Sequence, residues 1–175
     1  MILVFTGNGK GKTTAALGQM VRVVGRGKKA LMIQFIKGPR RSGEDEFAET
    51  FHISPSTFHI RKMGLGFVGI LGDKLPKEKH AEAAEKALKY FEKESKSGKW
   101  HLIVLDEINV AVSLGLLSAK QALRAIKNFP EEKILMLTGR NAPQEFIDAA
   151  DLVTEMKEIK HPFRKGKRAK FTVEF

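Results

Sequence analysis

The chain has 175 residues, and its 31 Lys and Arg residues outnumber 20 Asp and Glu residues, which gives a formal net charge of +11. This length predicts a single domain over residues 1–175, and the absence of cysteine excludes disulfides, thiolate metal sites and thiol catalysis. No apolar run reaches the roughly 18 residues of a membrane span, and the N-terminal MILVFTG is too short for a signal peptide, so we expect a cytoplasmic protein without membrane contact.

Short apolar runs alternate along the first part of the chain with helical stretches. Buried strands are predicted at 2–6 and 30–36, with a helix between them at 13–24. Residues 37–50 are expected to form a polar loop, followed by a short strand at 58–60.

The second part begins with a glycine-rich loop at 64–72. The clearest helix follows at 76–97, opening at Pro76 and ending near Gly98. The remaining predicted elements are buried strands at 102–107 and 134–138, a helix at 118–128 with Ser118 as N-cap, a short helix from Pro143, and strand candidates at 152–156 and 169–175.

Continuous apolar strands separated by helices predict an α/β fold of three layers, with a mostly parallel sheet and helices on both faces. Ligands bind such sheets at the carboxyl ends of the strands. Three polar segments fall at predicted strand ends: Thr6–Thr14, Asp106–Glu107 and Thr138–Arg140. We therefore expect them to converge on one site.

Residues 7–14, GNGKGKTT, stand between the first strand and the first helix, which is the context of a phosphate loop. Its glycines allow successive amides to face phosphate oxygens. Lys12 adds a positive charge, the helix adds its N-terminal dipole end, and Thr13 is placed to offer a hydroxyl to Mg²⁺. Thr6 stands where the general pattern has glycine, so the motif is a variant. The alternative is a glycine-rich turn with a surface lysine.

Two carboxylates, Asp106 and Glu107, end the strand LIVLDE, as Mg²⁺-binding carboxylates do in phosphate-loop enzymes. The alternative role is capping of a neighbouring helix. The turn at Thr138–Arg140 could meet a phosphate or substrate, or be a simple turn with a solvated arginine. The five histidines show no metal-ligand spacing. These features indicate nucleoside triphosphate binding without defining the reaction.

Several motifs together resemble the ATP:corrinoid (cob(I)alamin) adenosyltransferase family. The matching segments are FTGNGKGKTTAALG at 5–18, IQFIKG at 33–38, MGLGF at 63–67, LIVLDEINVAV at 102–112, LTGRNAP at 137–143 and DLVTEMKEIKHPF at 151–163. The Thr6 variant is the form that this family uses. The resemblance implies a RecA-like phosphate-loop NTPase fold and transfer of the 5′-deoxyadenosyl group of ATP to Co(I) of a corrinoid, releasing triphosphate, in adenosylcobalamin synthesis or salvage.

The resemblance also implies site residues. It assigns catalytic roles to Lys12, Thr13 and Glu107, with Mg²⁺ held by Thr13 and Glu107. Asn109 is implied as a nearby polar contact, and Arg140 is our further candidate contact. The triphosphate contacts are carried onto Gly7, Asn8, Gly9, Lys10, Gly11, Lys12, Thr13 and Thr14.

The family's corrinoid-contacting loop usually reads GxGFTW. Residues 64–67 match it, which places Phe67 below the corrin ring, but Val68 and Gly69 stand where Thr and Trp are expected. The alternative for Phe67 is an apolar anchor of a glycine-rich loop. Many relatives carry a charged extension before the first strand that helps to cover the active site, whereas this sequence begins at the strand, with Met1 and Ile2. Another element or a partner subunit is therefore expected to close the corrinoid site.

The implied partners are ATP, cob(I)alamin or a related corrinoid, and a second copy of the chain, since relatives are commonly homodimers. Cobalt(II) is hard to reduce and this cysteine-free chain supplies no electrons, so an external reductase such as a flavoprotein is also expected.

The distribution of charge bears on the alternatives. The nine basic residues before Glu44, with no acidic one among them, give the first 43 residues +9 of the total. We interpret this block as favouring triphosphate and the corrinoid side groups. The rival hypothesis is a RecA-like nucleic-acid-dependent ATPase, supported by the basic tail at 157–170 but weakened by its single aromatic residue, Phe163. A third is a nucleotide-binding regulator without catalysis.

Overall fold

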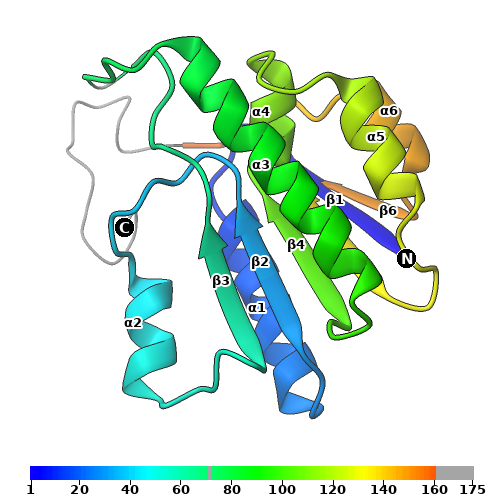
Figure 1. The fold of residues 1–175 in the computed structure, drawn as a ribbon. Coiled ribbons are helices and arrows are strands. Elements are labelled where there is room, and N and C mark those ends of the chain that lie inside the picture. The colour runs from blue at the N-terminus through cyan, green and yellow to red at the C-terminus, as the bar shows by residue number, and fades with distance from the viewer. Residues whose placement is uncertain (71, 161–175) are drawn as a thin grey trace.

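A computed structural model describes residues 1–70 and 72–160 and has three layers (Figure 1). The middle layer in this part of the chain is a sheet of β1 (Ile2–Thr6), β2 (Ala30–Gln34), β3 (Phe58–Lys62), β4 (Leu102–Asp106), β5 (Ile134–Thr138) and β6 (Leu152–Glu155). The strand order is β3-β2-β4-β5-β1-β6, and every pairing is parallel. The predicted parallel sheet is therefore confirmed.

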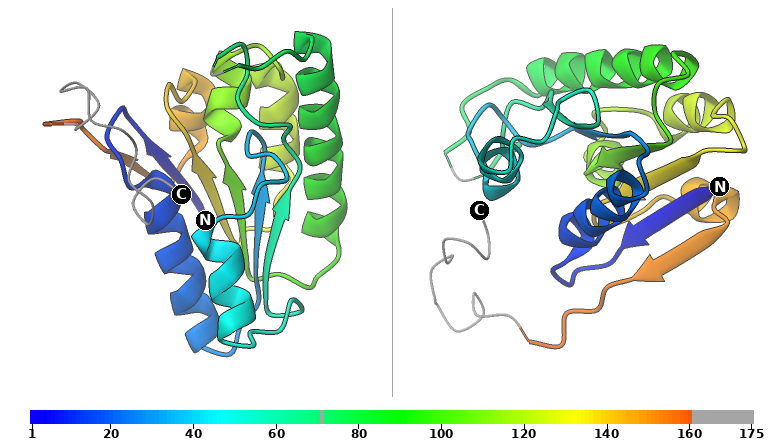
Figure 2. Two further views of the ribbon diagram at one scale, coloured as in Figure 1. Left: turned by 90° about the vertical axis from the view of Figure 1, so that its left-hand side faces the viewer. Right: turned by 90° about the horizontal axis from the view of Figure 1, so that it is seen from below.

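Helices cover both faces of the sheet, and Figure 2 shows α1 and α2 on the side opposite α3. One face packs on α1 (Lys12–Gly25) and α2 (Gly43–Thr50). The other packs on α3 (Lys77–Lys96), α4 (Ile108–Ser113), α5 (Ala119–Lys127) and α6 (Gln144–Ala149). The predicted three-layer α/β architecture is thus confirmed.

The strands supply both cores because successive side chains of a strand point to opposite faces. In β2, Leu31 and Ile33 pack on the side of α3, whereas Ala30 and Met32 pack on the side of α1. All five residues of β2 and of β4 are buried. This two-sided burial explains why the sequence shows continuous apolar runs instead of alternation.

Two helix starts follow the sequence signals. Pro76 is the N-cap residue of α3, which is one residue before the helix and agrees with the predicted start. At α5, the Ser118 hydroxyl accepts a hydrogen bond from the Gln121 amide at 3.1 Å, as its predicted N-cap role requires. No helix among the described residues combines the length and the hydropathy of a membrane span.

The expectation of a polar loop at 37–50 was wrong, because α2 forms there. The Asp45 carboxylate accepts the Ser42 amide at 2.8 Å, which satisfies a donor at the start of the helix. Lys62 of β3 forms an ion pair with the same carboxylate and so holds α2 against the sheet. No residue of α2 is fully buried, so its apolar pattern was too weak to reveal the helix.

The predicted strand at 102–107 ends one residue earlier, at Asp106. Glu107 has a φ of 63°, a left-handed conformation that breaks the strand and leads directly into α4. This short helix was not predicted, because no loop separates it from the strand. The strand candidate at 169–175 and most of the basic tail at 157–170 lie outside the described residues.

Candidate functional site

The three segments predicted to meet do come together at the carboxyl ends of strands β1, β4 and β5. The Thr13 hydroxyl donates to Asp106 Oδ1 at 2.9 Å, which joins the phosphate loop to the end of β4. The Glu107 amide donates to the Thr138 hydroxyl at 3.0 Å, which joins β4 to β5. The order β4-β5-β1 therefore gathers all three segments at one edge of the sheet.

The phosphate loop places a buried ammonium at the start of α1. Lys12 is 7% exposed, and its Nζ donates to the carbonyls of Gly7 and Gly9, each at 2.7 Å. Burial lowers the pKa of Lys12, with Arg140 and Lys10 acting in the same direction and the Glu107 and Asp106 carboxylates opposing them. A cation held at a helix N-terminus suits a bound anion such as a phosphate.

The segment after β6 packs directly on the phosphate loop. The Gly9 amide donates to the Met156 carbonyl at 2.6 Å, and the Met156 amide donates to the Thr6 carbonyl at 2.8 Å. A Cβ atom would lie 2.5 Å from the Met156 carbonyl oxygen at Gly7 and 2.6 Å from it at Gly9. Close backbone packing therefore adds to the reasons for glycine here, and no residue pattern in the sequence predicts this contact.

Asp106 is a fully buried carboxylate that accepts hydrogen bonds from three side chains. Its Oδ1 accepts from Thr13 and, at 2.7 Å, from the Thr138 hydroxyl, while its Oδ2 accepts from Gln34 Nε2 at 3.1 Å. Three donors compensate the loss of water around the charge. Sequence reasoning missed Gln34, although an amide at the end of the buried strand ALMIQ was a usable signal.

Glu107 lies beside this network and keeps one oxygen uncommitted. Burial, together with the charge of Asp106, raises the pKa of Glu107 to about 7, while Lys12, Lys37 and Arg140 oppose the rise. In the described part of the chain, three buried side-chain atoms have no hydrogen-bond partner: Gln34 Oε1, Glu107 Oε2 and Asn109 Oδ1. All three are acceptors that follow or end strands β2 and β4, so this edge can bind donor groups or a cation.

The two carboxylates at the end of β4, of which Asp106 accepts from the Thr13 hydroxyl, are oxygen ligands of the kind that Mg²⁺ takes together with a nucleotide. Mg²⁺ is held in such sites by one or two carboxylates together with phosphate oxygens and water. Asp106 and Glu107 are the carboxylates available, and the uncommitted Oε2 belongs to Glu107. No cluster of three or more His, Cys, Asp or Glu residues suited to a metal occurs within 1–70 and 72–160.

The other predicted contacts occupy the surroundings of the loop. Asn109 is buried, and its Nδ2 donates to the Gly139 carbonyl at 3.1 Å, which fixes the turn after β5. Arg140, in that turn, is exposed and close enough to Lys12 to affect its pKa. The remaining loop residues are exposed: Asn8, Lys10 and Thr14.

Phe67 follows β3 at the carboxyl edge of the sheet, where the phosphate loop also lies, but the two segments follow strands that are well separated in the sheet. It belongs to the loop after β3, which is four strand positions from β1 and so roughly 19 Å away at the usual strand spacing. Phe67 is 50% exposed. The Gly64 amide donates to the Gln34 carbonyl at 3.1 Å, so the base of this loop is fixed to the end of β2. A ligand that reached from the end of β1 to Phe67 would have to cross the ends of β5, β4 and β2.

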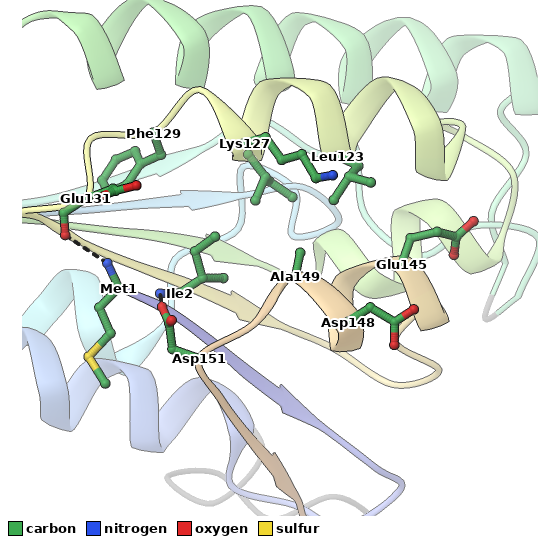
Figure 3. A pocket seen from close by; sticks show the side chains of 11 residues that line it. Met1, Ile2, Leu123, Lys127, Phe129, Glu131, Glu145, Asp148, Ala149 and Asp151 are labelled. Carbon is green, nitrogen blue, oxygen red and sulfur yellow. Dashed lines mark hydrogen bonds between the residues drawn. The ribbon is translucent and has the colours of Figure 1, made fainter.

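The basic N-terminal block is split between the two ends of the sheet, which corrects its assignment to the nucleotide site. Arg22, Arg26 and Lys28 line a hollow of about 580 Å³ with His101 and Ile134, at the amino ends of the strands. A larger cavity of about 910 Å³ also lies at the amino end, between α5, α6 and the start of β1 (Figure 3). Neither hollow belongs to the phosphate-loop site.

Comparisons with known proteins identify relatives along the whole chain. Residues 1–175 match the family described as ATP:corrinoid adenosyltransferase BtuR/CobO/CobP. The chain is 38% identical over its full length to the corrinoid adenosyltransferase of Pseudomonas aeruginosa and covers 83% of that protein. It is 39% identical to that of Sinorhizobium sp, of which it covers 80%, and 31% identical to corrinoid adenosyltransferase CobA of Salmonella typhimurium, of which it covers 85%.

Proposed function

The chain belongs to the ATP:corrinoid adenosyltransferase family, and from this membership we propose how its residues serve the reaction. The reaction transfers the 5′-deoxyadenosyl group of ATP to Co(I) of a corrinoid. The cobalt electron pair forms the bond to C5′ while the bond from C5′ to the triphosphate oxygen breaks, so triphosphate leaves. The match over residues 1–175 is the observation that carries this conclusion.

The reaction needs no protein base, because Co(I) is itself a strong nucleophile. The protein has to hold C5′ in line with the metal and to stabilise the negative charge on the leaving oxygen. The charge of Lys12 and the N-terminus of α1 support the second task. We propose that Lys12 Nζ exchanges the Gly7 and Gly9 carbonyls, its partners at 2.7 Å, for triphosphate oxygens.

Thr13 and Glu107 would hold Mg²⁺ with the triphosphate. The uncommitted Glu107 Oε2 supports this assignment, since Asp106 already accepts three hydrogen bonds. Asp106 would then orient Thr13 instead of binding the ion. When bound, Mg²⁺ neutralises part of the charge on the triphosphate.

The corrinoid is proposed to lie against the loop that carries Phe67. Its exposed ring is the feature that supports this placement. Asn109 and Arg140 are proposed to contact the nucleotide between the phosphate loop and the corrinoid. Asn109 donates to the Gly139 carbonyl and so fixes the turn after β5, and Arg140 lies in that turn.

The proposed function also includes a reductase partner, an oligomeric state and a cellular location. An external reductase, such as a flavoprotein, would supply the electron that converts Co(II) to Co(I), because the chain has no cysteine that could carry it. We also propose a homodimer and a cytoplasmic location. The nucleic-acid-dependent ATPase is not favoured, because the family and the named relatives are corrinoid adenosyltransferases.

The decisive test is anaerobic incubation with ATP, Mg²⁺ and chemically reduced cobalamin. We expect a light-sensitive adenosylated corrinoid together with an equal amount of triphosphate. Release of ADP and phosphate without any adenosylated product would contradict the proposal and would point to an ATPase.

A further inference from the structure

The loop between β3 and α3 exposes apolar side chains. Leu65, Phe67 and Ile70 are 42%, 50% and 59% exposed. Apolar side chains gathered on a surface mark binding sites more often than single ones do. Whether such a loop presents them in one arrangement depends on what holds its backbone.

One carboxylate holds this loop from inside. Asp73 Oδ2 accepts the Gly69 amide at 2.8 Å, and Asp73 Oδ1 accepts the Leu75 amide at 3.0 Å. The Asp73 amide in turn donates to the Ile70 carbonyl at 3.1 Å. The turn that follows Phe67 is therefore closed by Asp73 on both of its sides.

The same carboxylate is fixed to the body of the protein by His80. His80 Nε2 lies 3.0 Å from Asp73 Oδ2, and both side chains are covered, at 2% and 8% exposed. His80 stands in the first turn of α3, whose Ala84, Leu88 and Phe91 are buried in the core. A side chain on a packed helix thus determines where the loop carboxylate lies.

The backbone of the loop requires this support. Gly69 has a φ of +68°, a left-handed conformation that glycine adopts readily, and its amide donates to Asp73. Without the carboxylate, a glycine at this position is free to sample other conformations. Phe67 and Ile70, which flank it, would then lose their fixed arrangement.

We propose that Asp73 and His80 are positioning residues for adenosyl transfer, which hold Phe67 and Ile70 in the arrangement that receives the corrinoid. This inference rests on the proposed function, in which the Phe67 loop contacts the corrinoid. Neither residue touches a reacting atom. Binding loops work best when residues on rigid elements fix their backbone, and His80 of α3 meets that condition.

Variants of the full chain test the proposal. Asp73→Ala and His80→Leu remove the contact, whereas His80→Gln keeps a donor of similar reach. Glu82→Ala is the matched control, because it breaks an exposed ion pair with Lys79 on the same helix. The measurements are the KM for reduced cobalamin, the KM for ATP, and the rate of trypsin cleavage after Lys74, next to Asp73.

Asp73→Ala and His80→Leu are expected to raise the corrinoid KM about tenfold, as loss of a hydrogen bond to a charged group would, and to speed cleavage after Lys74. The KM for ATP should change by less than about twofold in both. His80→Gln and Glu82→Ala should resemble the unsubstituted chain. Because Asp73 lies in a loop, its variant remains informative if His80→Leu does not fold.

An unchanged corrinoid KM in Asp73→Ala, or an equal rise in the KM for ATP, would overturn the positioning role while leaving the proposed function intact. An unsubstituted chain that binds ATP but forms no adenosylated corrinoid would overturn the proposed function and this inference together. The two failures are therefore distinguishable.

Discussion

The Thr6 hydroxyl accepts a hydrogen bond from the Ala142 amide at 3.1 Å, and so ties the end of β1 to the turn that follows β5. A glycine at position 6 could not make this contact. The threonine that departs from the general phosphate-loop pattern thus has a structural role, because it fixes the turn that carries Arg140 beside the phosphate loop.

Replacing Thr6 should separate these two segments. Thr6→Val keeps the shape of the side chain but removes the acceptor, so we expect a loss of about 1 kcal/mol in the free energy of unfolding and a higher KM for ATP. Thr6→Ser keeps the hydroxyl and should behave like the unsubstituted chain. Urea unfolding and initial rates measure both effects; equal stability of the Val and Ser variants would argue against the contact.

Lys12→Ala should abolish adenosyl transfer while the fold is retained. Removal of a charge that stabilises the leaving oxygen is expected to lower kcat/KM at least about 100-fold. Lys28→Ala is the matched control, because Lys28 belongs to the same basic block but lies at the amino end of the sheet. Near-normal turnover of Lys12→Ala, with its circular dichroism spectrum unchanged, would be incompatible with the site as described.

Two glycines of the same region should respond to alanine in opposite ways. At Gly9 a Cβ would lie 2.6 Å from the Met156 carbonyl oxygen, so Gly9→Ala should separate the two segments and weaken ATP binding. At Gly18, in α1, a Cβ meets nothing within 4 Å. Gly18→Ala should therefore stabilise the protein by up to about 1 kcal/mol, from helix propensity. Calorimetric ATP titration and thermal unfolding check both; tight ATP binding by Gly9→Ala would refute the close packing.

Gly69→Trp should not improve corrinoid binding, although the family's loop carries Trp at this position. The φ of +68° costs a residue with a side chain about 1 kcal/mol or more, and relief of that strain would pull the Gly69 amide away from Asp73. We expect a higher corrinoid KM and an unchanged KM for ATP. A lower corrinoid KM would mean that the loop accepts a different backbone conformation.

The contribution of His59 to the free energy of unfolding should fall as the solution becomes mildly acidic, whereas Glu107, whose pKa is raised to about 7, acts in the opposite direction in the same range. Burial, with a further contribution from Arg61, lowers the pKa of His59, which stacks on Trp100 at 6.3 Å between ring centroids. Below about pH 6.5 the unfolded chain binds a proton at His59 that the folded chain does not. The contribution of His59 to the free energy of unfolding therefore falls as the pH drops, and it levels off once the lower folded pKa is passed.

Urea unfolding at about pH 7.5 and about pH 5.5 checks this linkage. Acidification should destabilise His59→Gln less than it does the unsubstituted chain, and His52→Gln, at an exposed position, should respond as the unsubstituted chain does. An identical change in all three proteins would assign the effect to other groups.

The sheet could be predicted because its strands are buried on both faces and therefore stand out as apolar runs, as LIVLD of β4 does. The phosphate loop, Asp106 and Glu107 could be placed together because parallel strands put their carboxyl ends at one edge. In contrast, α2 buries no residue completely and α4 follows β4 with a single residue between them. Neither helix leaves the apolar periodicity on which sequence reasoning depends.

The contacts that could not be predicted depend on the backbone conformation or on segments far apart in the chain. The Gly9 amide meets the Met156 carbonyl, and a backbone contact of this kind leaves no residue-type signal. The Asp73 carboxylate meets His80 across a turn whose shape depends on the conformation of Gly69. The split of the basic block likewise follows from the length of α1, which carries Arg22 and Arg26 to the opposite end of the sheet.

The three buried acceptors without partners have a thermodynamic consequence. Each of Gln34 Oε1, Glu107 Oε2 and Asn109 Oδ1 is buried without a hydrogen-bond donor from the described residues, and a buried acceptor without a donor costs stability. A ligand that supplies these donors recovers that cost on binding and shifts the unfolding equilibrium further than its other contacts alone would. Gln34 therefore acts in two ways at this edge of the sheet: its Nε2 stabilises the buried Asp106 carboxylate at 3.1 Å, while its Oε1 is left as an acceptor for a ligand.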